Sequence, residues 1–335
     1  MPRPIWKLAT VLLAAALALA GCGGGSQEGG TDTVRLAFSN PTIFTTGFPF
    51  YVARDQGFYE EAGLEVEANF TGGGAETVQT VVSGSSDIGT ETSAPAAIGA
   101  FSQGAPIKII SASTTGLDLF WFALADGPYN SREDLAGQKV GYSATGSSSH
   151  VGVLSLSDEL VAQGLEAIEA EAVGGPSENY TAVQADQIAA GWSQPPFFLE
   201  EVDNGELGIV ARGSDIGEYR DVAVRVNIVN TQFAEQNPET VRRFLEVQQR
   251  AWDWIFDNPE EAVRLWKEAA ELAESEEMLL TSFDYYERET MRLAPLDGQE
   301  TLIEDARRFG FLEDDLSEGQ INELFDLSYL PEEQQ

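Results

Sequence analysis

Hydroxyl groups, glycines and tryptophans stand at the points of this sequence where predicted strands end and predicted helices begin. They are Ser39, Asn40, Thr45, Thr46, Gly72, Gly73, Gly74, Thr92, Ser93, Thr145, Gly146, Ser147, Ser148, Ser149, His150, Trp192 and Ser193. Backbone N–H groups and serine hydroxyls at the start of a helix bind anions or carbonyl groups without a formal charge. A tryptophan adds an apolar wall with one N–H donor. The pattern predicts a binding site for a small polar molecule.

Several of these residues also have a structural interpretation. Ser93 and Ser147 are suitable N-caps for the helices that follow them. The run Gly72 to Gly74 lacks the following Lys-Ser/Thr of a phosphate loop and the G-x-G-x-x-G spacing, so we do not interpret it as a nucleotide site. His150 is the only histidine. Alone it cannot form a zinc site, and we favour a hydrogen-bonding or structural role over a general base. We expect no metal and no cofactor.

The chain is strongly acidic, with 55 Asp and Glu against 19 Lys and Arg and a formal net charge of −36. Such a field repels nucleic acid and anionic lipid headgroups, so neither is an expected partner. The charge has two interpretations: a solvated surface that maintains solubility, or adaptation to high salt, where screening acts within about 3 Å at molar ionic strength. We favour the second. With so many carboxylates, the sequence singles out no catalytic pair.

The N-terminal segment predicts export and a lipid anchor. A basic start is followed by an apolar run over 8–20, which is too short for a bilayer core of about 30 Å and indicates a signal peptide over 1–21. Leu19-Ala20-Gly21-Cys22 resembles the lipobox of bacterial lipoproteins, so the single cysteine, Cys22, is the expected lipid attachment site. The glycine-rich stretch 22–32 is the expected flexible tether. We therefore expect an extracytoplasmic body on the outer face of the bacterial cell membrane or its periplasmic side.

The body alternates β-rich runs with helical segments, which is typical of parallel α/β layers. The expected strands are 34–38, 64–70, 87–90, 108–114, 139–143, 169–173, 187–192 and 207–211, with helices over 48–56, 75–83, 147–163 and 177–184. Apolar runs at 119–124 and 222–229 are expected to cross between two domains. We predict a first lobe over 33–121 and 226–335, and an inserted second lobe over 122–225.

The C-terminal part is predicted to be helical. Asn237-Pro238-Glu239 and Asn258-Pro259-Glu260 each place a capping residue before a proline at the first helical position. The apolar residues of 241–256 recur at helical spacing. We interpret this stripe as packing against the first lobe rather than as a face for a partner.

Motifs along nearly the whole body resemble one family. They are the stretch 50–67 (FYVARDQGFYEEAGLEVE), Gly72 to Gly74, 82–89 (VSGSSDIG), 103–106 (QGAP), 134–140 (DLAGQKV) and 146–150 (GSSSH). In this order they are similar to those of the extracytoplasmic substrate-binding proteins of nitrate, sulfonate, taurine and thiamine-precursor ABC importers. The resemblance implies a type II periplasmic-binding-protein fold, with two Rossmann-like lobes joined by two hinge strands and extra C-terminal helices. It also implies closure on the ligand and docking to a permease.

By position, the resemblance implies which residues contact the ligand. The polar contacts are Asn40, Thr46, Thr92, Ser93, Ser147 and Ser148, with His150 beside them, and the walls are Phe48, Trp121 and Trp192. The expected partners are a small-molecule ligand, an ABC permease and its ATPase, and the membrane through the lipid, with the protein itself a monomer. We expect no enzyme activity.

The ligand class is open at this point. Hydroxyl-rich helix starts favour a sulfonate, a carboxylate or a related oxyanion, and two tryptophans favour an organic group over nitrate. One alternative is a neutral heteroaromatic such as a pyrimidine or other vitamin precursor, although Phe38-Ser39-Asn40-Pro41 replaces the Trp-x-Pro-Asn-like start of the pyrimidine branch. A second is a biosynthetic enzyme on the same fold, and a third is a tethered adhesion module without a hinge.

Overall fold

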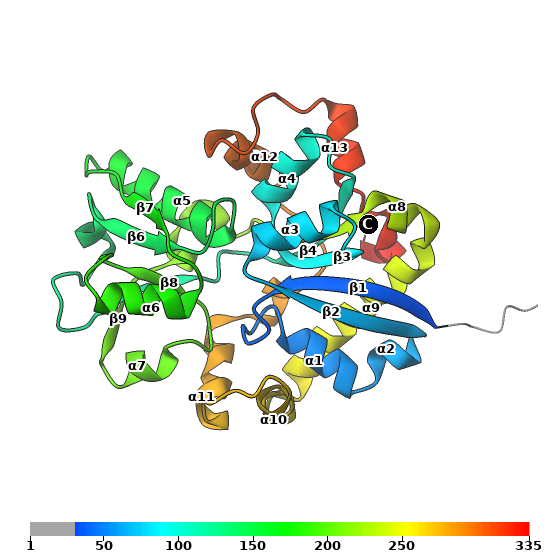
Figure 1. Ribbon diagram of the computed structural model, residues 1–335, viewed down its shortest axis with the longest axis horizontal. Coiled ribbons are helices and arrows are strands. Elements are labelled where there is room, and N and C mark those ends of the chain that lie inside the picture. The colour runs from blue at the N-terminus through cyan, green and yellow to red at the C-terminus, as the bar shows by residue number, and fades with distance from the viewer. Residues whose placement is uncertain (1–30, 335) are drawn as a thin grey trace, which may run out of the picture. The chain divides into compact units, whose positions relative to one another are not determined.

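A computed structural model describes residues 31–334 as a mixed α/β body built on one five-stranded sheet and two smaller ones (Figure 1). The described residues form one compact unit. The predicted signal peptide, Cys22 and most of the predicted tether lie outside the described residues. In the part of the chain that is described, none of the helices has the length and apolar character needed to cross a membrane.

The five-stranded sheet, called the first sheet, has the order β2-β1-β3-β10-β4. These strands are β2 (Leu64–Thr71), β1 (Asp32–Ser39), β3 (Ile88–Ser93), β10 (Arg225–Asn230) and β4 (Ile107–Thr114). β1 is parallel to β2 and β3, as the sequence predicts, whereas β10 is antiparallel to β3 and β4. The first sheet is therefore mixed, because β10 enters from the distant part of the chain in the opposite direction.

Helices cover both faces of the first sheet. In Figure 1, α3 (Gly74–Val82) and α4 (Ala94–Ser102) lie on one face, and α1 (Phe48–Asp55) lies on the other with α9 (Pro238–Asp257). The remaining helices near this sheet are α2 (Phe58–Glu61), α8 (Thr231–Gln236), α10 (Pro259–Ala269), α11 (Glu276–Leu280), α12 (Gln299–Arg308) and α13 (Glu318–Leu324). The apolar stripe of α9 is buried, which confirms the predicted core role of this helix.

The second-sheet region extends from β5 to β9. Its three-stranded sheet has β5 (Phe120–Leu124) between β8 (Gly191–Ser193) and β9 (Leu207–Arg212), and both pairs are antiparallel. A parallel pair, β6 (Lys139–Tyr142) and β7 (Glu169–Ala172), adjoins it through a bridge between Val140 and Ala190. The helices of this region are α5 (Ser148–Ala162), α6 (Pro176–Gln184) and α7 (Leu199–Asp203).

Two connecting segments join the first sheet to the second-sheet region. The apolar runs that we expected to be crossings are strands inside the sheets, β5 and β10, and the connecting chain lies beside them, at 115–119 and 213–224. The two segments are hydrogen-bonded, since the Gly213 N–H donates to the Leu119 carbonyl at 2.7 Å. They also approach closely, because a Cβ at Gly213 would lie 2.2 Å from the Leu117 carbonyl oxygen.

Candidate functional site

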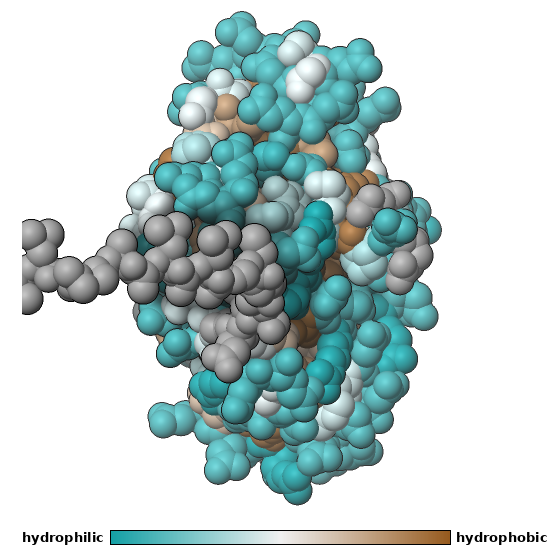
Figure 2. Space-filling model, turned by 90° about the vertical axis from the view of Figure 1, so that its right-hand side faces the viewer, coloured by the Kyte–Doolittle hydropathy of each residue, from teal (hydrophilic) through white to brown (hydrophobic). Residues whose placement is uncertain are grey.

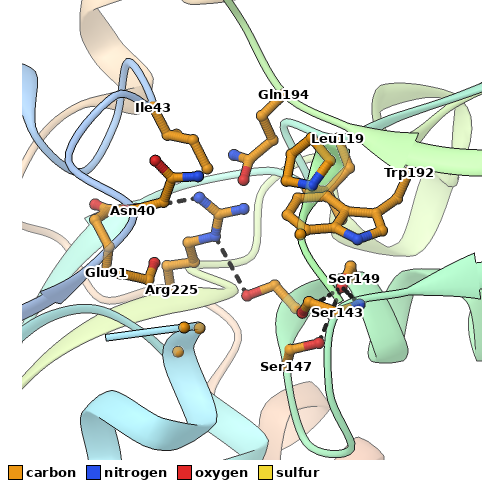
Figure 3. A pocket seen from close by; sticks show the side chains of 17 residues that line it. Asn40, Ile43, Glu91, Leu119, Ser143, Ser147, Ser149, Trp192, Gln194 and Arg225 are labelled. Atoms are coloured by element: carbon orange, nitrogen blue, oxygen red, sulfur yellow. Dashed lines mark hydrogen bonds and ion pairs between the residues drawn. The ribbon is translucent and has the colours of Figure 1, made fainter. Parts of the chain in front are cut away.

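A cavity lies where the first sheet meets the second-sheet region (Figure 3). It is lined by Ser39, Asn40, Ile43, Gly72, Gly73, Gly74, Glu91, Leu119, Ser143, Ser147, Ser148, Ser149, Gly175, Pro176, Trp192, Gln194 and Arg225. Its volume is about 40 Å³, which is room for about three water molecules. An organic ring enters only if the two regions move apart or the lining side chains rearrange.

The first-sheet wall of the cavity contains the start of α3. Gly74 is the first residue of this helix, and a Cβ there would lie 3.2 Å from the Ser93 backbone nitrogen. The Glu76 carboxylate accepts a hydrogen bond from the Gly72 N–H at 2.7 Å, which fixes the loop. Asn40 has a left-handed backbone (φ 32°), a conformation that asparagine tolerates better than most residues.

The opposite wall contains the start of α5 and a cluster of serines. Ser147 is the N-cap of α5, and its Oγ accepts from the His150 N–H at 3.2 Å. The Ser149 hydroxyl lies 2.9 Å from the Oγ of both Ser143 and Ser147. These bonds hold the hydroxyl groups in place before any solute arrives.

The sequence analysis missed four polar residues of this cavity, Glu91, Ser143, Gln194 and Arg225. Arg225 lies on β10, is 4% exposed, and its Nε donates to the Ser148 hydroxyl on the opposite wall at 3.2 Å (Figure 3). Its Nη1 donates to the Thr45 hydroxyl at 3.1 Å and lies 3.4 Å from Glu91, and its Nη2 lies 2.8 Å from Asp118. Every nitrogen of the guanidinium therefore has a protein partner.

The two carboxylates beside Arg225 are themselves held by hydrogen bonds. Glu91 accepts from the hydroxyls of Ser113 and Thr114. Asp118 accepts from Gln194 at 2.6 Å and from the Tyr286 hydroxyl at 3.2 Å. Burial raises the pKa of Glu91, against the opposing attraction of Arg225. Whether Glu91 is ionised or protonated, the trio of Arg225, Glu91 and Asp118 carries no excess positive charge.

Glu91 also has a left-handed backbone, with φ 55°. A non-glycine residue in this region costs about 1–3 kcal/mol of local strain. Its buried carboxyl group faces Arg225 at the cavity, so the strained backbone places an ionisable group at the candidate site.

Four of the sequence-predicted contacts line the cavity, and six do not. Asn40, Ser147, Ser148 and Trp192 are lining residues. Thr46 lies behind Asn40 and donates to its carbonyl oxygen at 2.5 Å, and Thr92 donates to the Val226 carbonyl at 2.8 Å. Ser93 is fully buried at the start of α4, and its hydroxyl has no hydrogen-bond partner in the described structure.

The aromatic residues predicted as walls have different surroundings. Phe48 is fully buried and stacks on Trp266 at 4.6 Å between ring centroids, so it belongs to the core on the α1 and α9 side. Trp121 is also fully buried and packs under α5, where a Cβ at Gly152 would lie 2.8 Å from its ring. Trp192 lines the cavity, and its Nε1 donates to the Gly174 carbonyl at 2.9 Å.

His150 lies beside the serine cluster but is not part of the cavity lining. Its ring stacks on Tyr142 at 4.2 Å between centroids, and the Phe311 ring lies nearly perpendicular to it at 5.9 Å between centroids. Its Nδ1 accepts from the Gly146 N–H at 3.2 Å, which requires an unprotonated Nδ1. In this position the imidazole supports the loop that leads into α5.

We expect acid to weaken the fold through His150. Burial lowers the pKa of His150 below its ordinary 6.5, so the unfolded chain takes up the proton at higher pH than the folded one. The stabilising contribution is complete above pH 6.5 and is lost as the pH falls below it. The melting temperature of His150→Gln should therefore fall less than that of the wild type between pH 7 and pH 5. An equal fall in melting temperature between pH 7 and pH 5 for the two proteins would contradict this role of His150.

Among residues 31–334, no three or more His, Cys, Asp or Glu side chains form a group that could hold a metal ion. The groups that reach the cavity are hydroxyls, amides, helix N–H groups, one aromatic ring, a few aliphatic side chains, and the Arg225 guanidinium paired with the Glu91 carboxyl group. Such an arrangement can orient a small molecule by hydrogen bonds and one apolar face.

Two known proteins are similar to this chain in sequence. RibY, a riboflavin-binding protein of Chloroflexus aurantiacus, is 26% identical over 234 residues, which are 65% of this chain and 61% of RibY. YtlA of Bacillus subtilis is 42% identical over 79 residues, which are 23% of this chain and 22% of YtlA. The chain thus spans less than two thirds of the length of either relative.

Solved structures share the fold. The alkanesulfonate-binding protein SsuA of Xanthomonas axonopodis pv. citri, bound to MOPS, has a TM-score of 0.70 at 13% identity, covering 90% of this chain and 98% of SsuA. The nitrate-binding protein NrtA of Synechocystis PCC 6803 has a TM-score of 0.67 at 16% identity, covering 89% and 87%. At identities this low, the structural similarity establishes the fold alone. It confirms the predicted periplasmic-binding-protein fold. A sequence model of the family described as NMT1/THI5 like matches residues 45–262.

Proposed function

We propose that this protein, a member of the NMT1/THI5-like family, captures a small organic solute for an ABC importer. The family membership follows from the match at residues 45–262, which covers more than half of the chain. The first sheet with its helices would be one lobe, and the second-sheet region the other. We keep the predicted lobe boundaries as part of this proposal: 33–121 with 226–335 for the first lobe, and 122–225 for the second. The extracytoplasmic location, the lipid on Cys22, the monomeric state and delivery to a permease also belong to it.

One observation carries the proposal. Two helix starts, those of α3 and α5, come from opposite regions of the chain and meet at the same cavity. The N–H groups at a helix start have no partners within the helix and are available to a ligand. A solute held by both would draw the two regions together, as capture by closure requires.

The charge balance of the cavity supports an uncharged solute. The sequence favoured an oxyanion, but the lining residues include one cation, Arg225, whose charge is already met by Glu91 and Asp118. An anion would have to rely on neutral donors, namely helix N–H groups, hydroxyls and the Asn40 amide, next to two carboxylates. The overall charge of −36 adds no attraction for it.

The side-chain amides of Asn40 and Gln194 provide a hydrogen-bond donor and an acceptor for such a solute. The Asn40 Oδ1 accepts from Thr42, and the Gln194 Nε2 donates to Asp118. Within residues 31–334, this leaves the Asn40 Nδ2 as a donor and the Gln194 Oε1 as an acceptor, and Figure 3 shows both side chains on the same side of Arg225. A donor beside an acceptor matches the carbonyl and N–H edge of a neutral nitrogen heterocycle, and Trp192 offers its ring a flat apolar wall.

A series of similar rings with different charge tests the proposal. We expect a neutral pyrimidine to bind at least about tenfold more tightly than benzenesulfonate or N-methylpyridinium, which is a difference of about 1.4 kcal/mol. Titration calorimetry measures the affinities. A thermal-shift screen at low and high salt should show a gain of about 2.7 kcal/mol at a hundredfold excess of solute over Kd. Tighter binding of the sulfonate would overturn the ligand class but not the capture function.

The alternative of an enzyme on the same fold makes a different prediction. Product formation from any bound solute by the purified protein would replace capture with catalysis. Failure of all solutes to change the melting temperature would instead favour the tethered-module alternative.

The face of the protein shown in Figure 2 is mostly hydrophilic, with smaller apolar areas between polar residues. This agrees with the acidic composition. High salt would screen repulsion between such charges, so the proposed saline adaptation predicts that the melting temperature rises with salt.

A further inference from the structure

Helix α12 contacts both regions that line the cavity. Its buried residues Leu302 and Ala306 belong to the same core as residues of α4, and Figure 1 shows the two helices side by side. Just beyond α12, the Phe311 carbonyl approaches Gly99 of α4, where a Cβ would lie 2.5 Å from the oxygen. This packing fixes α12 to the first-sheet side.

Polar contacts attach α12 to the other side. Asp305, only 2% exposed, accepts a hydrogen bond from the Tyr219 hydroxyl at 2.7 Å. Tyr219 belongs to the connecting segment 213–224, and its hydroxyl also lies 2.6 Å from Ser155 of α5. Arg308 donates to Asp158 of α5 at 2.7 Å and lies 3.4 Å from Glu218. One cluster therefore joins α12, a connecting segment and α5.

We propose that Asp305 and Tyr219 are positioning residues for closure, holding α5 and the second connecting segment against α12 when the two regions close over the cavity. This inference rests on the proposed capture function. The start of α5 supplies Ser147 and Ser148 to the cavity, so a contact that fixes α5 also fixes half of the solute site. Neither residue lines the cavity, and both act through α5 and the connecting segment.

The cluster makes closure sensitive to protons. Burial raises the pKa of Asp305 to about 6, against an ordinary value of 3.8. The groups that face Asp305 are Glu304 and Arg308 on α12, Glu218 and Tyr219 on the connecting segment, and Ser155 and Asp158 on α5, while α4 carries no charged side chain. Glu218 and Glu304 raise the pKa further, and the Tyr219 hydrogen bond and Arg308 lower it.

The sign of the effect follows from exposure. If opening returns Asp305 to water, its pKa falls toward the ordinary value, so the closed form binds the proton more tightly. Closure is then favoured at acidic pH and weakens as the pH rises through 6. A carboxyl whose pKa moves between 3.8 and about 6 changes the closing equilibrium by about tenfold between pH 7 and pH 5.

Solute affinity of the full chain, measured by calorimetry across pH 5 to 7, tests the proposal. Asp305→Asn is neutral at every pH and still accepts from Tyr219, so it should bind more tightly than the wild type at pH 7, and this advantage should shrink about tenfold between pH 7 and pH 5 as the wild-type carboxyl takes up its proton. Tyr219→Phe should weaken binding at both pH values. Glu300→Gln, an exposed residue on the same helix that is not among the groups facing Asp305, is the matched control and should keep the wild-type profile.

The ratio of wild-type to Asp305→Asn affinity removes the contribution of His150, which both proteins share. Small-angle scattering without solute adds a readout that needs no ligand: the wild type should become more compact from pH 7 to pH 5, and Asp305→Asn should be equally compact at both. Tight solute binding with a constant affinity ratio and matching scattering profiles would overturn the inference while leaving capture intact. Failure of every solute to bind would overturn capture, and the scattering comparison would still decide the inference.

Discussion

Arg225→Met should lower the free energy of unfolding by about 3–5 kcal/mol, because it removes the cation between two buried carboxylates. Glu91 and Asp118 would then face each other without compensation, in a site where the arginine side chain is 5% exposed and their own are 1% and 5% exposed. Chemical denaturation monitored by tryptophan fluorescence measures the loss. The loss should be smaller at pH 5 than at pH 7, since protonating a buried carboxylate relieves the repulsion.

A second set of variants separates the charge from the packing. Adding Glu91→Gln and Asp118→Asn to Arg225→Met removes the unpaired charges and should restore a large part of the lost stability. Arg242→Met is the matched control: Arg242 is 39% exposed and pairs with Glu239 within α9, so its loss should stay below about 1 kcal/mol. If Arg225→Met cost no more than this control, the trio would not be the buried ionic centre described above.

Arg225 also illustrates what could and could not be read from the sequence. The sequence predicted the apolar run 222–229 to be a crossing between the domains, and most of it is the buried strand β10. A single arginine within such a run signals a buried charge that needs a partner. The sequence could not identify the partners of Arg225, because Asp118 and Glu91 lie 107 and 134 residues away along the chain, among 55 carboxylates. Strand direction was equally hidden, since an apolar run has the same composition in a parallel and an antiparallel pair.

Helix starts were easier to predict than the roles of their side chains. Proline, glycine and serine signals are local, and they placed the starts of α3, α4 and α5 within a residue or two. Ser93 and Ser147 both precede a helix, yet only Ser147 caps one with its side chain. The Ser93 hydroxyl is buried without a partner, an outcome that depends on its packing against β10 and Gly74 rather than on its neighbours in sequence.

The two tryptophans that the sequence put forward as walls should respond differently to truncation. Trp121 and Trp192 are direct partners across β5 and β8, so sequence periodicity could not decide which one reaches the cavity. Either change to alanine should cost about 3–5 kcal/mol of stability, since both side chains are buried. Trp192→Ala should also weaken solute binding at least about tenfold, because it removes the apolar wall and the hydrogen bond to Gly174.

Trp121 supplies the matched control for the binding effect. Its ring packs beneath Gly152 in the core and does not line the cavity, so Trp121→Phe should lower the melting temperature while leaving Kd within about twofold of the wild type. Trp192→Phe keeps an apolar ring and guards against loss of folding, and it should still weaken binding because no donor remains for the Gly174 carbonyl. Titration calorimetry on folded samples measures the solute affinities of the wild type, Trp192→Ala, Trp192→Phe and Trp121→Phe. Equal affinities for Trp192→Phe and Trp121→Phe would mean that the solute does not contact Trp192. The proposal that the cavity between the two regions is the capture site would then be wrong.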